Sequence, residues 1–201
     1  MPIQQFFPVI SSSAIVYARD DRAAAVQAAL LNQATQSAEY GNLPGSWPQL
    51  RSYENDPSEV IIPYVWGPTN FNSGLRLGFA AIVSPGSTLP SGNYAYSFGT
   101  FADNAHRAYL ELYTVVGTTI TLVQTIFSNF IAGSLDPNIT QTIPYNWQFL
   151  RTSSGAFTTA SAGILVLSYE VQNYNDTPGL TSASNPAALS FGFQLFGESV
   201  G

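Results

Sequence analysis

Residues 75–83 read LRLGFAAIV, and their alternation of apolar side chains predicts a β-strand with one buried face. The residues expected on that face are Leu75, Leu77, Phe79, Ala81 and Val83. Similar alternation recurs around Tyr94, Leu165 and Phe191. We therefore expect one common core, formed by residues 75–83, 94–98, 110–112, 165–171 and 191–195.

Working outward from this stretch, the β pattern continues to the end of the chain. We expect strands near 59–66, 74–83, 92–101, 106–116, 119–130, 139–150, 161–172 and 188–196. Val116-Gly117-Thr118 separates two long β-rich segments and indicates a tight hairpin turn. Strands of this number, with turns of uneven length, are typical of a two-sheet antiparallel β-sandwich. Jelly-roll connectivity is the expected topology, and an immunoglobulin-like sandwich is the alternative.

The first third of the chain has a different character. We divide the chain into an extended N-terminal arm (1–18), a helix with an irregular proline-containing stretch (19–58) and the β-sandwich (59–201). The alanine-rich segment 20–39 is the expected helix, with Asp20 or Asp21 as its N-cap and Gly41 and Pro44 after its end. Its apolar face is modest, so it should lie on the outside of a sheet.

The arm is rich in apolar residues that a soluble monomer would not leave in water. We expect it to contact a neighbouring subunit, and an ordinary edge strand is the alternative. The candidate contact residues are Ile3, Phe6, Phe7, Val9, Ile10, Ile15 and Val16.

The composition is poor in charge. Only 9% of the 201 residues are charged, all six basic residues are arginine, and the formal net charge is −6. A typical soluble domain carries about a quarter charged residues. Such a surface suits packing against copies of the same chain, and its acidity argues against binding to nucleic acid or to an anionic membrane.

Catalytic patterns are missing from the sequence. The absence of cysteine removes disulfides, thiolate catalysis and cysteine zinc sites. His106 is the single histidine, and we expect it to be a solvated turn residue that no activity requires. Glu111 and Glu170 should point to solvent or to a neighbour, and turn chemistry explains acidic groups such as Asp136 with Asn138. We expect no catalytic residue, cofactor or metal.

Aromatic residues provide the best sequence evidence for a binding surface. Flat aromatic faces beside Asn, Asp and Gln can recognise sugars. The same aromatic residues can instead anchor a protein–protein contact or lie in the core. The candidates for glycan or partner binding are Trp47, Tyr53, Tyr64, Trp66, Tyr145 and Trp147.

These observations predict a non-enzymatic structural subunit of a large self-assembling particle, in particular a capsid, decoration or tail-associated protein of a virus or bacteriophage. Its partners would be copies of itself and other particle proteins. The N-terminus lacks the basic region of a secretory signal, and no apolar run is long enough to span a membrane, so synthesis in the host cytoplasm and location in the virion are expected. The alternative is a carbohydrate-binding sandwich, either a lectin or a receptor-binding module.

Overall fold

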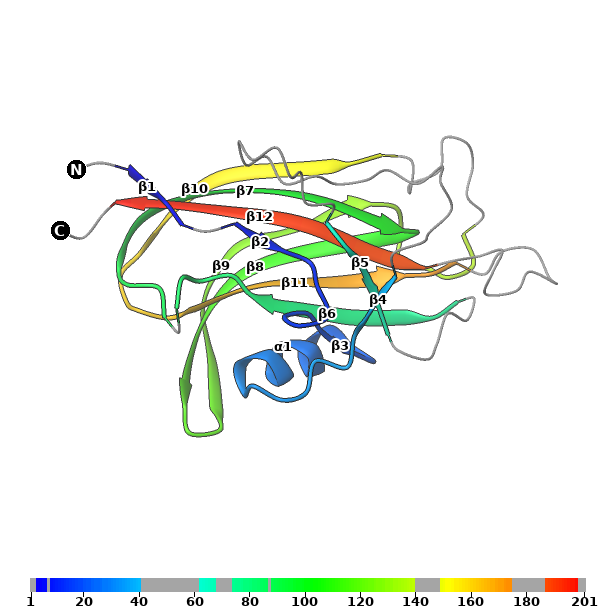
Figure 1. The fold of residues 1–201 in the computed structure, drawn as a ribbon, viewed down its shortest axis with the longest axis horizontal. Helices are drawn as coiled ribbons and strands as arrows, with labels where there is room; N and C mark the ends of the chain where they lie inside the picture. Colours follow the sequence, from blue (N-terminus) through cyan, green and yellow to red (C-terminus); the bar gives the residue numbers. More distant parts are fainter. Residues whose placement is uncertain are drawn as a thin grey trace.

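The computed structural model describes residues 3–6, 8–40, 62–67, 74–86, 88–139, 149–174 and 187–198. Within them, two antiparallel sheets pack face to face and one helix, α1 (Arg22–Leu30), lies outside the second sheet (Figure 1). The predicted β-sandwich is confirmed.

The strands of the first sheet run in the order β10 (Arg151–Thr159), β7 (Gly92–Asp103), β12 (Ala188–Glu198), β5 (Tyr64–Trp66) and β4 (Ala38–Tyr40). Two short segments, β1 (Ile3–Gln5) and β2 (Val9–Ile10), also pair with β12. The order in the second sheet is β3 (Tyr17–Arg19), β6 (Arg76–Ile82), β11 (Ile164–Gln172), β8 (Ala105–Val116) and β9 (Thr119–Ala132).

The pairing from β5 to β12 is nested. β8 pairs with β9, β7 with β10, β6 with β11, and β5 with β12. Nested antiparallel pairs describe one long hairpin folded across two sheets, which is the jelly-roll arrangement. At its centre, Val116 pairs with Thr119 across a two-residue turn, and Gly117 adopts φ +62 there, so the predicted hairpin is confirmed.

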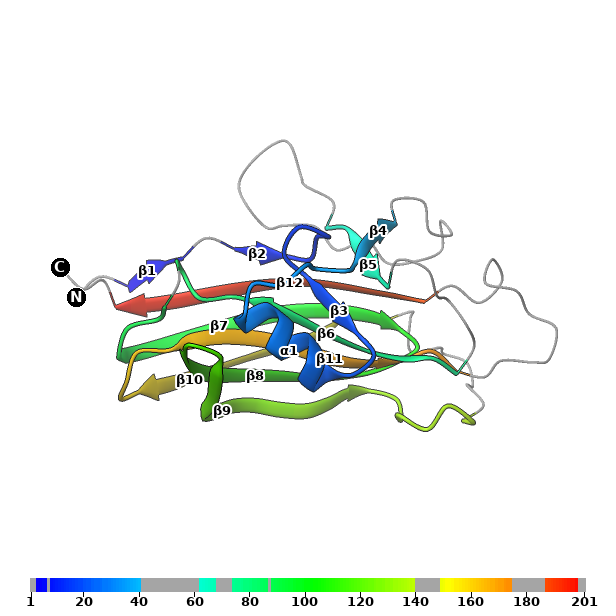
Figure 2. The ribbon, with the colours of Figure 1, turned by 90° about the horizontal axis from the view of Figure 1, so that it is seen from below.

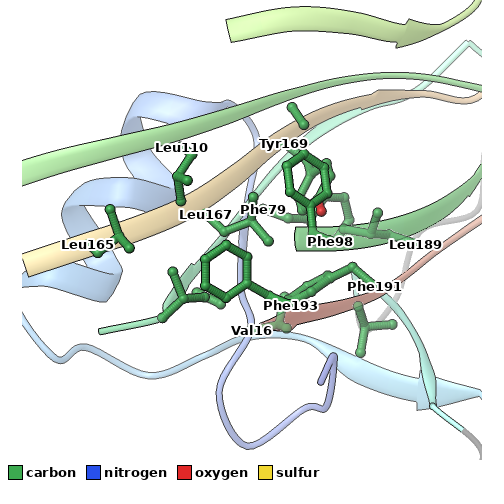
Figure 3. Packing of buried hydrophobic residues seen from close by; sticks show 14 of the residues in the cluster. Val16, Phe79, Phe98, Leu110, Leu165, Leu167, Tyr169, Leu189, Phe191 and Phe193 are labelled. Atoms are coloured by element: carbon green, nitrogen blue, oxygen red, sulfur yellow. The ribbon is translucent and has the colours of Figure 1, made fainter. Parts of the chain in front are cut away.

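The core lies between the two sheets, where the alternation had placed it. Figure 3 shows Phe79, Leu167 and Phe193 among the buried side chains that fill this space. All three are buried, and the Phe79 ring packs on Trp66 with 5.4 Å between centroids.

The helix is much shorter than the predicted 20–39. Its N-cap is Asp21, whose side chain accepts a hydrogen bond from the Ala24 N–H at 2.8 Å. The helix ends at Leu30, because Asn32 takes the left-handed φ of 50 and the chain then extends. The Thr35 carbonyl accepts from the Ala18 N–H at 2.8 Å, so this segment lines β3 in place of further helix.

The helix covers the outer face of the second sheet, as expected. Its buried residues Ala25, Val26 and Ala29 pack with Ala80 and Val166 of β6 and β11. Gly78 of β6 makes the close approach of the helix start possible, because a Cβ there would overlap the backbone of Asp21 and Arg22.

The described residues of the arm, 3–6 and 8–18, lie along the sandwich of their own chain, as the alternative of an edge strand expects, and the contact with a neighbouring subunit stays a prediction. β5 pairs with β12 only at Leu189. Elsewhere along that edge, β12 pairs with β1 and β2 of the same chain. Ser11 fixes the arm there: its hydroxyl donates to the Pro63 carbonyl at 2.7 Å and accepts from the Phe191 N–H at 3.1 Å.

The side chains of the arm follow this pairing. Val16 is fully buried in the core. The core is also contacted by Phe6, Val9 and Ile15, while Ile10 packs against a smaller cluster around Phe101. Phe7 lies outside the described residues. These five side chains are thus covered at least in part by their own chain, while the side chain of Ile3 lies outside the described ones.

The predicted strand at 139–150 falls largely outside the described residues. Residues 140–148 lie outside the described residues, while Phe149 and Leu150 are not in a strand and β10 begins at Arg151. The sequence of β10, RTSSGAFTT, hides this strand because it contains little apolar alternation. Phe157 is its one large buried side chain, as suits a strand at the edge of a sheet.

Candidate interaction surface at the edge of the second sheet

The most exposed apolar segment among the described residues is the edge strand β9. It is 14 residues long, and β8 is the one strand that pairs with it in the described chain. Figure 2 shows β9 along one border of the molecule, with β4 and β5 on the opposite border. An edge strand presents unpaired backbone N–H and C=O groups, which offer a template for another strand.

The side chains of β9 also favour association with another chain. β9 contains no charged residue and no proline, two of the devices that commonly protect an edge. Leu122 and Phe130 are 49% and 48% exposed. Three register shifts against β8 place Val123, Ile126 and Ile131 as extra residues that bend the strand, but these bulges add no charge.

The other described edges have less capacity for pairing. β3 and β4 contain three residues each, and the backbone of Thr35 already covers β3 at Ala18. β10 is longer, with nine residues, but its exposed side chains are small: Thr152, Ser154, Ala156 and Thr158. β9 is therefore the edge at which both backbone pairing and apolar contact are available.

A polar cluster lies next to β9 on the outer face of the second sheet. Arg22 at the start of α1 donates to Glu111 of β8 at 2.6 Å, and the Tyr113 hydroxyl donates to the same carboxylate at 2.6 Å. The Arg22 guanidinium also lies 3.9 Å from the centroid of the Tyr109 ring, whose hydroxyl donates to Glu170 at 2.7 Å. Burial and the Glu111 carboxylate raise the pKa of Tyr113.

Solvent and a neighbour were the two expected directions for Glu111, and solvent is wrong, since Glu111 is 4% exposed under Arg22 and Tyr113. In the register of β8 and β11, Glu111 lies opposite Val166 and Glu170 lies opposite Arg107. Arg107 and Glu111 are four residues apart along β8, so their backbones are about 13 Å apart. Each carboxylate has its own partners: Glu111 accepts from Arg22 and Tyr113, and Glu170 accepts from Tyr109. The cluster holds α1 to β8.

Glu111→Gln is expected to lower the free energy of unfolding by about 2 kcal/mol, because it removes the ion pair of a buried carboxylate while Arg22 can still reach water. Glu170→Gln is the matched control, since Glu170 is only half-buried and bonds one tyrosine, and should cost less than about 1 kcal/mol. Urea unfolding followed by circular dichroism measures both. Equal effects would mean that Glu111 is not the anchor of the helix.

His106 is buried, not solvated, which corrects the sequence interpretation. It is 1% exposed and belongs to β8, whose inward positions also include Ala108 and Leu110. Its ring centroid lies 6.4 Å from that of Tyr169, and neither ring nitrogen has a hydrogen-bond partner in the described part of the chain. Burial, and then the charge of Arg151, lower the pKa of His106 from 6.5 to about 3.

Two of the six aromatic candidates for glycan binding lie among the described residues. Tyr64 and Trp66 lie in β5 and are buried, Tyr64 edge-on to Phe101 at 5.6 Å and Trp66 against Phe79, so neither can serve as a surface platform. The remaining four candidates lie outside the described residues: Trp47, Tyr53, Tyr145 and Trp147.

The described residues contain neither a metal-binding cluster nor a membrane-spanning helix. No three of their Asp, Glu or His side chains lie close enough together to hold a metal ion. Asp136 accepts a hydrogen bond from the Asn138 N–H at 2.9 Å, the turn chemistry that the sequence suggested. None of their helices has both the length and the apolarity needed to cross a membrane.

Comparison with known proteins gives only distant likenesses. No protein-family model matches the sequence, and no curated protein matches it. The CBM22-1 xylan-binding domain of Xyn10C from Paenibacillus barcinonensis is similar with a TM-score of 0.40 and 10% identity, over 83% of this chain and 88% of that domain. TmCBM61 in complex with β-1,4-galactotriose is similar with a TM-score of 0.37 and 12% identity, over 91% of this chain and 88% of that chain.

The VP2 subviral particle protein of infectious bursal disease virus gives a TM-score of 0.28 and 10% identity, over 96% of this chain and 54% of that one. The function of the present chain is therefore inferred from its own residues.

Proposed function

We propose that this protein is a non-enzymatic structural subunit that assembles with copies of itself, and that the edge strand β9 is a contact through which it does so. The observation that carries this proposal is the combination of a 14-residue edge strand without charge or proline and the exposed side chains of Leu122 and Phe130. Long, apolar and uncharged edges pair with other chains unless something covers them.

The charge-poor sequence supports the same function. With 9% charged residues, the molecule has little electrostatic repulsion to keep copies apart. A virus or bacteriophage particle is the kind of assembly we propose, because the jelly-roll is a fold from which capsids are built.

The test is size-exclusion chromatography with light scattering on the wild-type chain and on Leu122→Lys combined with Phe130→Lys. The wild type should form oligomers, and the double variant should raise the apparent Kd by at least about tenfold, since charges at a self-contact repel each other. Ala34→Lys with Ala95→Lys is the matched control, because both alanines are exposed and Ala34 lies beside β3, at the opposite end of the second sheet from β9. A monomeric wild type, or equal association by both variants, would contradict the proposal.

Carbohydrate binding is the second candidate function, and one observation favours it. Phe149 is 41% exposed, with the Arg151 guanidinium 5.1 Å from its ring centroid, so a flat ring beside a hydrogen-bond donor is available at the surface. Binding on a glycan array that Phe149→Ala weakens would support this function. Binding that Phe149→Ala leaves unchanged would exclude this ring from the site.

A further inference from the structure

We infer that the partner of β9 is the β9 strand of a second copy, paired antiparallel across a two-fold axis so that the second sheets of two molecules become one continuous sheet. The inference rests on the proposed function and adds to it the identity of the partner strand, the symmetry and the register.

The layout of the edges argues for two-fold symmetry. In the order of strands, β9 and β10 are the terminal strands on one side of the two sheets, and β3 and β4 are the terminal strands on the other side. Head-to-tail extension would place β9 against β3 or β4, each of which offers three residues. Extension over a longer stretch needs the long edges of both molecules, β9 or β10, and this brings the same side of each molecule together. When both molecules use the same strand, such a contact is isologous, as in a two-fold dimer.

Two arrangements then remain for β9: pairing with the β9 of the other copy, which is isologous, and pairing with its β10, which joins two different strands. Side chains distinguish them. β9 exposes Leu122 and Phe130, whereas the exposed positions of β10 carry Thr, Ser and Ala. Pairing β9 with itself therefore brings apolar groups of the two copies together, while pairing it with β10 would place Leu122 and Phe130 against small and mostly polar side chains.

The sequence of β9 also suits self-pairing. Thr125 lies near the middle of the strand, so a two-fold axis there would place Thr121 opposite Asn129 of the other copy. In the same register, Leu122 of one copy comes within the diagonal reach of Phe130 of the other. Because β9 has no charged residue, no register brings like charges together within the pair. The outer face beside it is held in place by Arg22 and Glu111, which already pair with each other.

The absence of cysteine makes disulfide trapping a clean test. Three single-cysteine variants are compared: Thr121→Cys, Thr125→Cys and Asn129→Cys. All three positions are exposed. A disulfide needs Cα atoms within about 7 Å, so only near-opposite positions can link. We expect Thr125→Cys alone to give a covalent dimer on a non-reducing gel. Thr121→Cys and Asn129→Cys should each stay uncrosslinked alone and give a covalent dimer when mixed.

A fourth variant, Ser154→Cys in β10, separates the alternatives. A covalent dimer formed by mixing Thr125→Cys with Ser154→Cys, but not by Thr125→Cys alone, would assign β10 as the partner and overturn the inference. Light scattering on the same samples separates the two levels of the proposal. Oligomers in which Thr125→Cys does not crosslink to itself overturn the β9 pairing alone, whereas monomers overturn the proposed function with it.

Discussion

Phe79→Ala is expected to lower the free energy of unfolding by about 3–5 kcal/mol, because it removes a large buried ring and leaves a cavity. Phe79 is fully buried, lies opposite Tyr169 in the register of β6 and β11, and packs on Trp66. Neighbours from both sheets hold it, so the site cannot easily collapse onto the space that the ring leaves. Chemical denaturation at neutral pH measures the change.

Leu167→Ala should lower the stability by an amount within about 2–5 kcal/mol, since Leu167 is equally buried between β6 and β8. Phe149→Ala is the control of matched chemistry, because that ring is partly exposed and outside every described strand, and it should cost less than about 1 kcal/mol. A Phe79→Ala protein that unfolds at the wild-type denaturant concentration would mean that the inward face of β6 is wrong.

The sequence was informative where one face of a strand is buried. The alternation through Leu77, Phe79 and Ala81 fixes which side of β6 faces the core, because a shift of one residue would turn every apolar side chain outward. It was uninformative for β10, where Ser, Thr and Gly dominate. The helix end was also missed, because Asn32 ends α1 through its backbone conformation and not through glycine or proline.

The candidate sites were harder to predict than the fold. Tyr64 and Trp66 follow an irregular stretch in the sequence, yet β5 places both in the interior. His106 stands beside Asp103 and Arg107, which suggested solvent, but its strand begins at Ala105 and directs the ring inward. The exposed edge of β9 depends on the strand order, and order in a sheet comes from contacts between distant segments that local alternation does not encode.

His106 is expected to make the protein sensitive to acid well above the pH at which most carboxylates titrate. Burial, and then the Arg151 charge, lower the pKa of His106 to about 3, whereas the unfolded chain titrates at 6.5. Between these two pH values, the unfolded state therefore binds a proton at His106 and the folded state does not. The neutral ring contributes its full stability above pH 6.5, and this stability is lost as the pH falls toward 3.

The expected loss is about 1.4 kcal/mol per pH unit below 6.5, or about 2 kcal/mol between pH 7 and pH 5. This window lies above the ordinary pKa of Asp and Glu, so the histidine dominates it. Urea unfolding across the window should show the slope in the wild type, and His106→Leu should remove it because leucine fills the apolar site without titrating. The comparison is one of slopes, so it holds even if His106→Leu changes the stability at pH 7. A slope that survives in His106→Leu would place the acid sensitivity elsewhere. A wild type without any slope would mean that the ring accepts its proton in the folded state, and therefore that the end of the core around Arg151 and Tyr169 admits water.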